Sequence, residues 1–171
     1  MMKALTEIEI DALKVFKRGK VRTVYDLGDN LLIVASDRIS AFDYILPNGI
    51  PDKGKILTRI SGFWFRKLSH ISSNHLISDC VDDFPEILKP YSELLRDRSM
   101  LVRKAHRIDI ECIVRGYLSG SAWREYQATG KVAGSKLREG LQKDAELETP
   151  IFTPSTKTEE GHDRNITIDE M

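Results

Sequence analysis

The sequence predicts an α+β protein in which antiparallel hairpins come early, and it argues against a doubly wound parallel sheet. Three observations support this class. Residues 14–36 contain β-favouring runs around a Gly-Asp-Asn turn, which is typical of a hairpin. Residues 55–71 carry apolar side chains at three- and four-residue spacing, which indicates an amphipathic helix. Residues 99–117 indicate two further strands with a tight connection around residues 106–108.

The clearest elements lie in the first part of the chain. Val21, Thr23 and Tyr25 alternate with charged or small residues, and "LLIVAS" (31–36) follows the turn as a buried strand. "DDFPEILKPY" (82–91) predicts a short helix with an aspartate cap and an early proline. The helix at 55–71 is expected to carry one apolar stripe, made of Ile56, Ile60, Phe63, Trp64, Leu68 and Ile71.

The later part of the chain is less regular. A helix is expected over 121–129, closed by Gly130. Residues 131–171 are polar, with glycine and proline punctuation and only short apolar groups. This composition predicts a functional loop or an unfinished element.

Composition excludes several classes of protein. Lys plus Arg equals Asp plus Glu, 26 against 26, so no overall field favours nucleic acid or an anionic membrane. No apolar run is long enough to span a bilayer, and the N-terminus lacks a secretory signal. Cys80 and Cys112 have no metal-binding spacing and are expected to be buried, reduced thiols. A cytoplasmic protein without nucleic-acid or membrane partners is predicted.

The stretch "KRGKVRTVYDLG" (17–28) concentrates positive charge around one glycine. A glycine at a hairpin turn lets backbone N–H groups approach phosphate oxygens, and neighbouring cations neutralise the charge. The stretch lacks the second glycine and the hydroxyl of a GxxxxGK[ST] loop, so it is nearer to a glycine hairpin that covers a nucleotide. The alternative is a hairpin whose solvated basic edge prevents pairing with other strands.

A second polar segment, "SDRISAFDYILPNGIPDKGK" (36–55), follows the buried strand and contains Asp37 and Ser40. Loops at strand ends are where binding residues concentrate. Carboxylates there can orient an amine or hold a divalent ion. Taken alone, an Asx-type turn with a helix cap explains the segment better.

The strongest local signal is "IECIVRGYLSGS" (110–121), in which Glu111 lies among apolar strand residues. A buried carboxylate needs a partner, so Glu111 is expected to have a cation or a metal beside it. Arg115 offers a planar fork suited to phosphate, and residues 119–121 open the next helix, where the dipole favours anions. The alternative is a structural Glu111–Arg115 pair with an ordinary N-cap at Ser121.

The last segment of interest is "PIFTPSTKTEEGHDRN" (150–165), an irregular stretch rich in hydrogen-bond donors. Its hydroxyls, together with Lys157, His162 and Asp163, suit a polyphosphate or a dicarboxylate. A flexible, solvated loop explains the same composition.

Three of these stretches, in this order, resemble one family: residues 18–65, "IECIVRGYLSGSAWREY" (110–126) and "PIFTPSTKTEEGHDRNI" (150–166). The chain resembles phosphoribosylaminoimidazole-succinocarboxamide synthase (SAICAR synthetase), a ligase of purine biosynthesis, over nearly all of residues 17–166. The resemblance implies an ATP- and Mg²⁺-dependent joining of carboxyaminoimidazole ribotide to L-aspartate. Phosphoryl transfer activates the carboxylate, and the aspartate amine then displaces phosphate, with no covalent side-chain nucleophile.

The resemblance also implies roles for individual residues. The basic hairpin covers the triphosphate, Arg115 and the serine-flanked turn hold the ribotide 5′-phosphate, and Glu111 faces the imidazole and a bound Mg²⁺. The expected nucleotide-binding residues are Lys17, Gly19, Lys20, Val21, Arg22, Lys104 and Lys157. The expected substrate-binding residues are Asp37, Ser40, Glu111, Arg115, Ser119, Gly120, Ser121, His162 and Asp163.

The implied fold is α+β and related to the ATP-grasp, with two lobes. Residues 1–107 form the nucleotide-binding lobe and residues 108–171 begin a second lobe that is incomplete. Such a chain is expected to self-associate or to be partly disordered near its C-terminus, and a homo-oligomer is possible.

The chain departs from the family in two ways. Asp109 replaces the usual proline, and Ser119 stands where threonine or alanine is common. More importantly, the given sequence ends at Met171, before the D-x-K-x-E-F-G stretch and the later acidic segment with which the family continues. Those two segments supply the family's metal-binding carboxylates.

The 171-residue chain alone is therefore expected to lack full ligase activity, and a catalytically inactive binding module is the first alternative. A kinase-like phosphotransferase is a weaker alternative, because neither HRD nor DFG occurs. A nucleic-acid-binding module is the least favoured, because no aromatic platform interleaves the basic residues.

Overall fold

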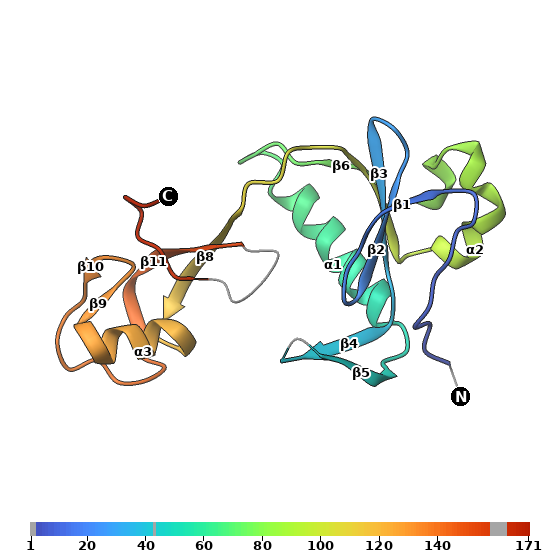
Figure 1. The fold of residues 1–171 in the computed structure, drawn as a ribbon. Helices are drawn as coiled ribbons and strands as arrows, with labels where there is room; N and C mark the ends of the chain where they lie inside the picture. The colour runs from blue at the N-terminus through green and yellow to red at the C-terminus, as the bar shows by residue number, and fades with distance from the viewer. Residues whose placement is uncertain (1–2, 43, 158–163) are drawn as a thin grey trace. The chain divides into compact units, whose positions relative to one another are not determined.

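The computed structural model describes residues 3–42, 44–157 and 164–171. The chain divides into two compact units, Met1–Ala105 and His106–Met171 (Figure 1).

The first unit is built on a five-stranded antiparallel sheet in the order β1-β2-β3-β7-β6. A turn in which the N–H of Gly28 donates to Asp26 (2.9 Å) connects β2 to β3. A separate hairpin pairs β4 with β5. The strand bounds are Lys14–Arg18 for β1, Arg22–Asp26 for β2, Asn30–Ala35 for β3, Arg38–Ala41 for β4, Tyr44–Gly49 for β5, Leu76–Ser78 for β6 and Ser99–Arg103 for β7.

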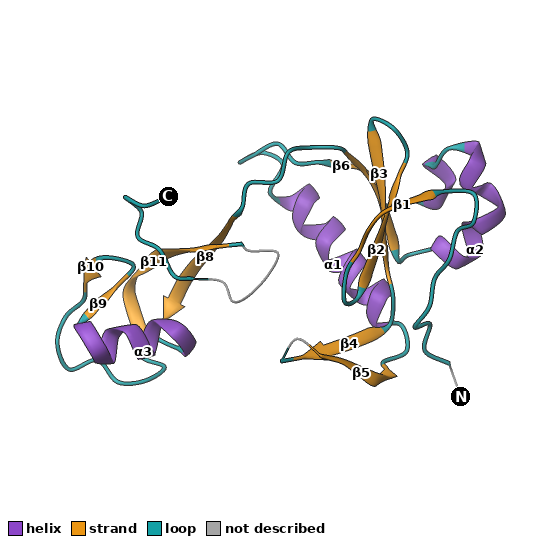
Figure 2. Ribbon diagram, in the orientation of Figure 1, coloured by secondary structure: helices purple, strands orange, loops and turns teal. Residues whose placement is uncertain are grey.

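One face of this sheet carries the main hydrophobic core. Short helical turns cover it: η1 (Val81–Asp83), η2 (Glu86–Tyr91) and α2 (Ser92–Leu95). Figure 2 shows these turns and the helix α1 on opposite sides of the sheet. The core side chains are Ile8, Ile10, Tyr25, Leu32, Val34, Val81, Phe84, Leu88, Leu95 and Leu101.

The helix α1 (Lys53–Lys67) confirms the predicted helix, and it packs against β3 and β7 with its small residues instead of its apolar stripe. The buried positions are Gly54, Thr58 and Gly62. A Cβ atom at Gly54 would lie 2.4 Å from the carbonyl oxygen of Ala35, so the helix backbone approaches the sheet closely. The large apolar side chains therefore lie on the opposite side of the helix and are exposed.

The close approach of α1 to the sheet predicts that a larger residue at Gly54 destabilises the first unit. We expect Gly54→Ala to lower the free energy of unfolding by about 1–3 kcal/mol, because the added methyl group meets backbone atoms that cannot move aside cheaply. Arg59→Ala, at an exposed position of the same helix, should change it by less than about 0.5 kcal/mol. Urea unfolding followed by circular dichroism checks both values, and equal effects would contradict the packing.

The second unit is a long two-stranded ribbon with one helix. β8 (Ile110–Tyr117) pairs antiparallel with β11 (Glu146–Thr156), with Ile113 opposite Thr153. The helix α3 (Gly120–Thr129) ends at Gly130, whose φ is 69° and whose N–H donates to Tyr126. The short strands β9 (Lys131–Val132) and β10 (Ser135–Lys136) form a hairpin. The small core contains Leu118, Ala122, Val132, Leu141 and Leu147.

The two strands predicted within residues 99–117 are confirmed as β7 and β8, and they belong to different sheets, because β7 lies between β3 and β6 while β8 pairs with β11. Two other expectations are wrong. Residues 146–156 form a strand with a register shift between Glu146 and Ile151, whereas a loop or an unfinished element was expected. Cys80 and Cys112 are exposed free thiols, whereas buried thiols were expected.

No helix within residues 3–42, 44–157 and 164–171 is long and apolar enough to cross a membrane.

Candidate functional site

The β1–β2 hairpin presents the predicted nucleotide-binding residues at its tip. Residues 17, 19, 20 and 22 are exposed, and Val21 is half-buried. The turn is closed by the N–H of Gly19, which donates to the carbonyl oxygen of Arg22 (2.8 Å). The tip therefore displays cations and backbone together, as a phosphate-covering hairpin requires.

Two residues beneath the tip hold it in place, and the sequence prediction did not assign them to the site. The hydroxyl of Ser36 donates to the carbonyl oxygen of Val21 (2.9 Å). The guanidinium of Arg38 donates to Ser36 (3.1 Å) and to the carbonyl oxygen of Gly19 (3.2 Å). These bonds connect the segment after β3 to the hairpin turn, so the hairpin is braced from within the first unit.

Lys104 lies at the far end of the same sheet and makes structural contacts. Its ammonium donates to a carboxylate oxygen of Asp26 (2.9 Å) and lies 5.1 Å from the ring centroid of Phe16. The hydrogen bond from Lys104, with one from the N–H of Gly28, lowers the pKa of the Asp26 carboxyl. The expected contact of Lys104 with the nucleotide stays a prediction.

Asp37 is buried and its carboxylate is fully engaged. One oxygen accepts from the N–H of Leu5 (2.8 Å), the other from the N–H of Gly54 (3.0 Å), and Arg98 forms an ion pair at 3.0 Å. Burial by itself raises the pKa of the Asp37 carboxyl, but these hydrogen bonds outweigh it and hold the pKa below its ordinary value. The geometry gives Asp37 a structural role within the first unit. Ser40 lies half-buried on β4.

In the second unit, Arg115 on β8 bridges two hydroxyls. Its Nε donates to Thr153 on β11 (3.0 Å), and a terminal nitrogen donates to Ser121 in the first turn of α3 (3.1 Å). Thr153 in turn donates to the carbonyl oxygen of Ile113 (3.2 Å). The three side chains form what we call the Arg115 cluster, and it lies at the start of α3.

The alternative explanation of this segment, a Glu111–Arg115 pair with an N-cap at Ser121, is not observed. Among the ion pairs of the described residues none includes Arg115. The N-cap is Ser119, without a side-chain capping bond, and Ser121 lies inside the helix. Gly120 adopts a φ of 60°, a conformation that favours glycine. The turn thus has a backbone conformation that favours glycine, and the Arg115 guanidinium donates hydrogen bonds to hydroxyl groups instead of pairing with a carboxylate.

The space around the Arg115 cluster is narrow. The cavity behind it measures about 10 Å³, which is close to the minimum for one water molecule. A phosphate does not fit there. It would have to approach from the solvent side, where Gly120 is exposed and Ser119 is half-buried.

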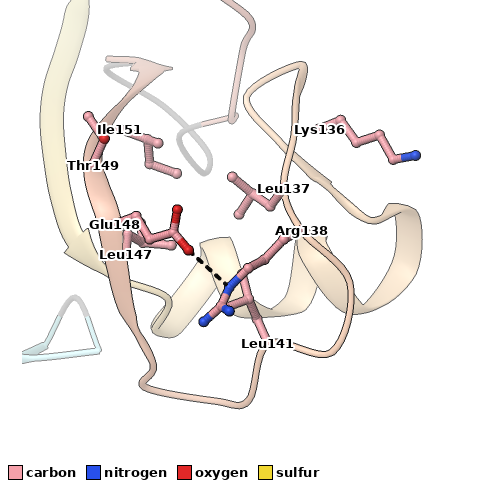
Figure 3. Close-up of a pocket in the computed structure, with 8 residues that line it drawn as sticks. All are labelled: Lys136, Leu137, Arg138, Leu141, Leu147, Glu148, Thr149 and Ile151. Atoms are coloured by element: carbon pink, nitrogen blue, oxygen red, sulfur yellow. Dashed lines mark ion pairs between the residues drawn. The ribbon is translucent and has the colours of Figure 1, made fainter.

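A larger cavity of about 240 Å³ lies elsewhere in the second unit (Figure 3). Leucine and isoleucine side chains line its base, and an ion pair between Arg138 and Glu148 (3.7 Å) spans part of it. None of the predicted site residues lines this cavity.

Comparison with known proteins identifies the family. The SAICAR synthetase profile matches residues 15–171. The phosphoribosylaminoimidazole-succinocarboxamide synthase of Thermodesulfovibrio yellowstonii is 56% identical over 170 residues, covering 99% of this chain and 58% of the relative. The chain belongs to the SAICAR synthetase family. The family expected from the sequence is therefore confirmed.

Solved structures of SAICAR synthetases agree with this fold. The SAICAR synthase of Saccharomyces cerevisiae, solved in complex with SAICAR, is 45% identical with a TM-score of 0.85, covering 98% of this chain and 57% of the yeast chain. A type-2 SAICAR synthetase in complex with ADP is 22% identical with a TM-score of 0.67, covering 92% of this chain and 56% of that one. The predicted α+β SAICAR synthetase fold is confirmed, and the chain spans less than two thirds of the length of these relatives.

The expectation that Glu111 is buried is wrong. Its side chain is 45% exposed and pairs with Lys157 at 3.7 Å across the β8–β11 ribbon. The ribbon has two strands, and the side chains of Glu111 and Cys112 on β8 lie open to solvent. This ion pair joins Glu111, which was expected to bind substrate, to Lys157, which was expected to bind the nucleotide.

The expected roles of His162 and Asp163 and the expected metal site stay predictions. His162 and Asp163 lie outside the described residues. Within the described parts of the chain, no three His, Cys, Asp or Glu side chains are grouped to hold a metal ion. Glu111, the residue expected to contact Mg²⁺, therefore belongs to no such group among the described residues, and its metal role stays a prediction.

Proposed function

We propose that this chain supplies nucleotide- and ribotide-binding elements of a SAICAR synthetase. In the complete reaction, ATP phosphorylates the carboxylate of carboxyaminoimidazole ribotide, which gives an acyl phosphate and ADP. The amine of L-aspartate then attacks the acyl carbon, forms the amide bond and releases phosphate. The contribution of this chain to that reaction is positioning and charge neutralisation.

The Arg115 cluster is the observation that supports the ribotide part most directly. It brings a half-buried guanidinium and two hydroxyls, of which that of Thr153 is buried, to the N-terminus of a ten-residue helix. A guanidinium and a helix N-terminus both favour a phosphate group. The relative from Saccharomyces cerevisiae, solved with SAICAR, belongs to the same family and is 45% identical to this chain over the matched region.

The β1–β2 hairpin is the corresponding candidate for ATP. Lys17, Lys20 and Arg22 are exposed around Gly19, and Ser36 and Arg38 brace the turn from below. A braced turn loses little conformational freedom when it covers a polyphosphate, which favours binding.

The ribotide proposal is tested by titrating the chain with SAICAR and with its nucleoside, which lacks the 5′-phosphate. We expect Arg115→Ala to weaken SAICAR binding about 10-fold or more, since it removes charge-assisted hydrogen bonds. Binding of the nucleoside should change little.

The matched control is Arg124→Ala, at an exposed position of the neighbouring helix α3, which should leave both affinities unchanged. Isothermal titration calorimetry gives the affinities, and thermal unfolding shows that each variant is folded. An Arg115→Ala variant that binds SAICAR normally, or that loses both ligands equally, would remove the phosphate role.

A binding module without turnover is the second candidate function. It would use the same Arg115 cluster and β1–β2 hairpin for binding, without forming product.

A further inference from the structure

The outward side of α1 carries an apolar surface that the first unit leaves uncovered. We call it the α1 stripe, and it consists of Ile56, Ile60, Phe63, Trp64, Leu68 and Ile71, which are all exposed. At 3.6 residues per turn, the four members within the helix lie opposite the buried positions Gly54, Thr58 and Gly62. The helix therefore presents small residues to the sheet and large apolar residues away from it.

The α1 helix is held firmly in this orientation. Residues without large side chains let its backbone reach the sheet, and Gly62 leaves no room for a Cβ atom beside Asp79. Arg66 forms an ion pair with Asp79 at 2.8 Å, and the N–H of Gly54 donates to Asp37. Turning the stripe inward would break these contacts, so the stripe can be buried only by something that covers it from outside.

The side chains of the stripe are also ordered among themselves. The rings of Phe63 and Trp64 meet edge to face, with centroids 5.3 Å apart. The ammonium of Lys67 lies 5.4 Å and 5.1 Å from these two centroids. A preorganised apolar surface of this extent on a soluble fold is typical of a contact surface.

We propose that the α1 stripe is the docking surface for the C-terminal polypeptide that longer members of the family carry. The matched relatives have about two fifths of their length outside the part that this chain matches. In those relatives that polypeptide is part of the same chain as the matched region, so it is present at high effective concentration. The inference rests on family membership and not on the ligand-binding roles proposed above.

The proposal can be tested by thiol labelling. Residues 1–171 are fused to the unmatched C-terminal part of the Thermodesulfovibrio yellowstonii synthase, and a cysteine is introduced by Ile60→Cys or by Ile87→Cys. The two positions are closely matched, because both are isoleucines with 49% exposure, and Ile87 lies in η2 on the other side of the sheet. Iodoacetamide labelling of each site is followed by peptide mass spectrometry in the fusion and in the 171-residue chain.

We expect the Ile60→Cys thiol to react about 10-fold or more slowly in the fusion than in the 171-residue chain, because burial restricts reaction to opened states. The Ile87→Cys thiol should react at similar rates in both. An unchanged Ile60→Cys rate in the fusion would overturn the proposal, whatever ligase activity the fusion has. Slowing of Ile60→Cys in the 171-residue chain as its concentration rises would also overturn it, because a second copy would then cover the stripe.

Discussion

Replacing Asp37 by asparagine should lower the free energy of unfolding of the first unit by about 3–5 kcal/mol. The substitution keeps the shape of the side chain but leaves the buried guanidinium of Arg98 without its countercharge. It also weakens the bonds that the carboxylate accepts from the N–H groups of Leu5 and Gly54. Urea unfolding at neutral pH, followed by tryptophan fluorescence and circular dichroism, measures the loss.

The matched control is Asp79→Asn, which removes the carboxylate from another Asp–Arg pair of the same unit. Its partner, Arg66, is exposed, so the expected loss is about 0–1 kcal/mol. If both variants lose the same amount, burial does not determine the contribution of the Asp37–Arg98 pair.

The effect of Asp37→Asn should also depend on pH. Because the pKa of Asp37 in the folded protein lies below its ordinary value of 3.8, the unfolded chain takes up a proton first as the pH falls. The stabilisation by Asp37 is therefore complete above that ordinary value and is lost as the pH falls through the lower folded value. The difference between wild type and variant should stay constant near neutral pH and shrink in acid.

The 171-residue chain alone should form no SAICAR above the background without enzyme. Most of the expected rate enhancement in phosphoryl transfer comes from positioning and neutralising the phosphates. The described residues offer no group of three potential metal ligands for this task. The assay supplies ATP, Mg²⁺, carboxyaminoimidazole ribotide and L-aspartate, with the full-length Thermodesulfovibrio yellowstonii synthase as the positive control.

A positive rate from the 171-residue chain would contradict this expectation and would exclude the module without turnover. No rate, together with SAICAR binding that depends on Arg115, would support that module. No rate and no binding would count against the proposed function itself, while leaving the docking proposal for the α1 stripe to its own test.

Local patterns predicted the local structure well. The alternation around Val21, Thr23 and Tyr25 corresponds to β2, and Gly130 ends α3 with the positive φ that a helix stop favours. The basic hairpin and the serine-flanked turn after β8 lie where the residue patterns placed them. These features depend on neighbours only a few positions away.

Errors in the prediction concern which side of an element is covered. The periodicity of α1 marks an apolar stripe, yet the helix buries Gly54, Thr58 and Gly62. Glu111 was expected to be buried, yet it lies on an open ribbon beside Lys157. The carboxylate of Asp37, assigned to the substrate side, bonds to Arg98, which is remote in the sequence, and to the N–H groups of Leu5 and Gly54; its substrate role stays a prediction.

The sequence by itself therefore determined the family, the order of its motifs, the helices α1 and α3 and the strands β1, β2, β3, β7 and β8, because turn chemistry and side-chain periodicity act over short distances along the chain. Only the tertiary structure decided which face of α1 meets the sheet, which strand pairs with β8, and that Arg115 bonds to Thr153 and Ser121. Those outcomes depend on how closely two backbones approach and on side chains that belong to other strands and helices. A local sequence pattern determines neither.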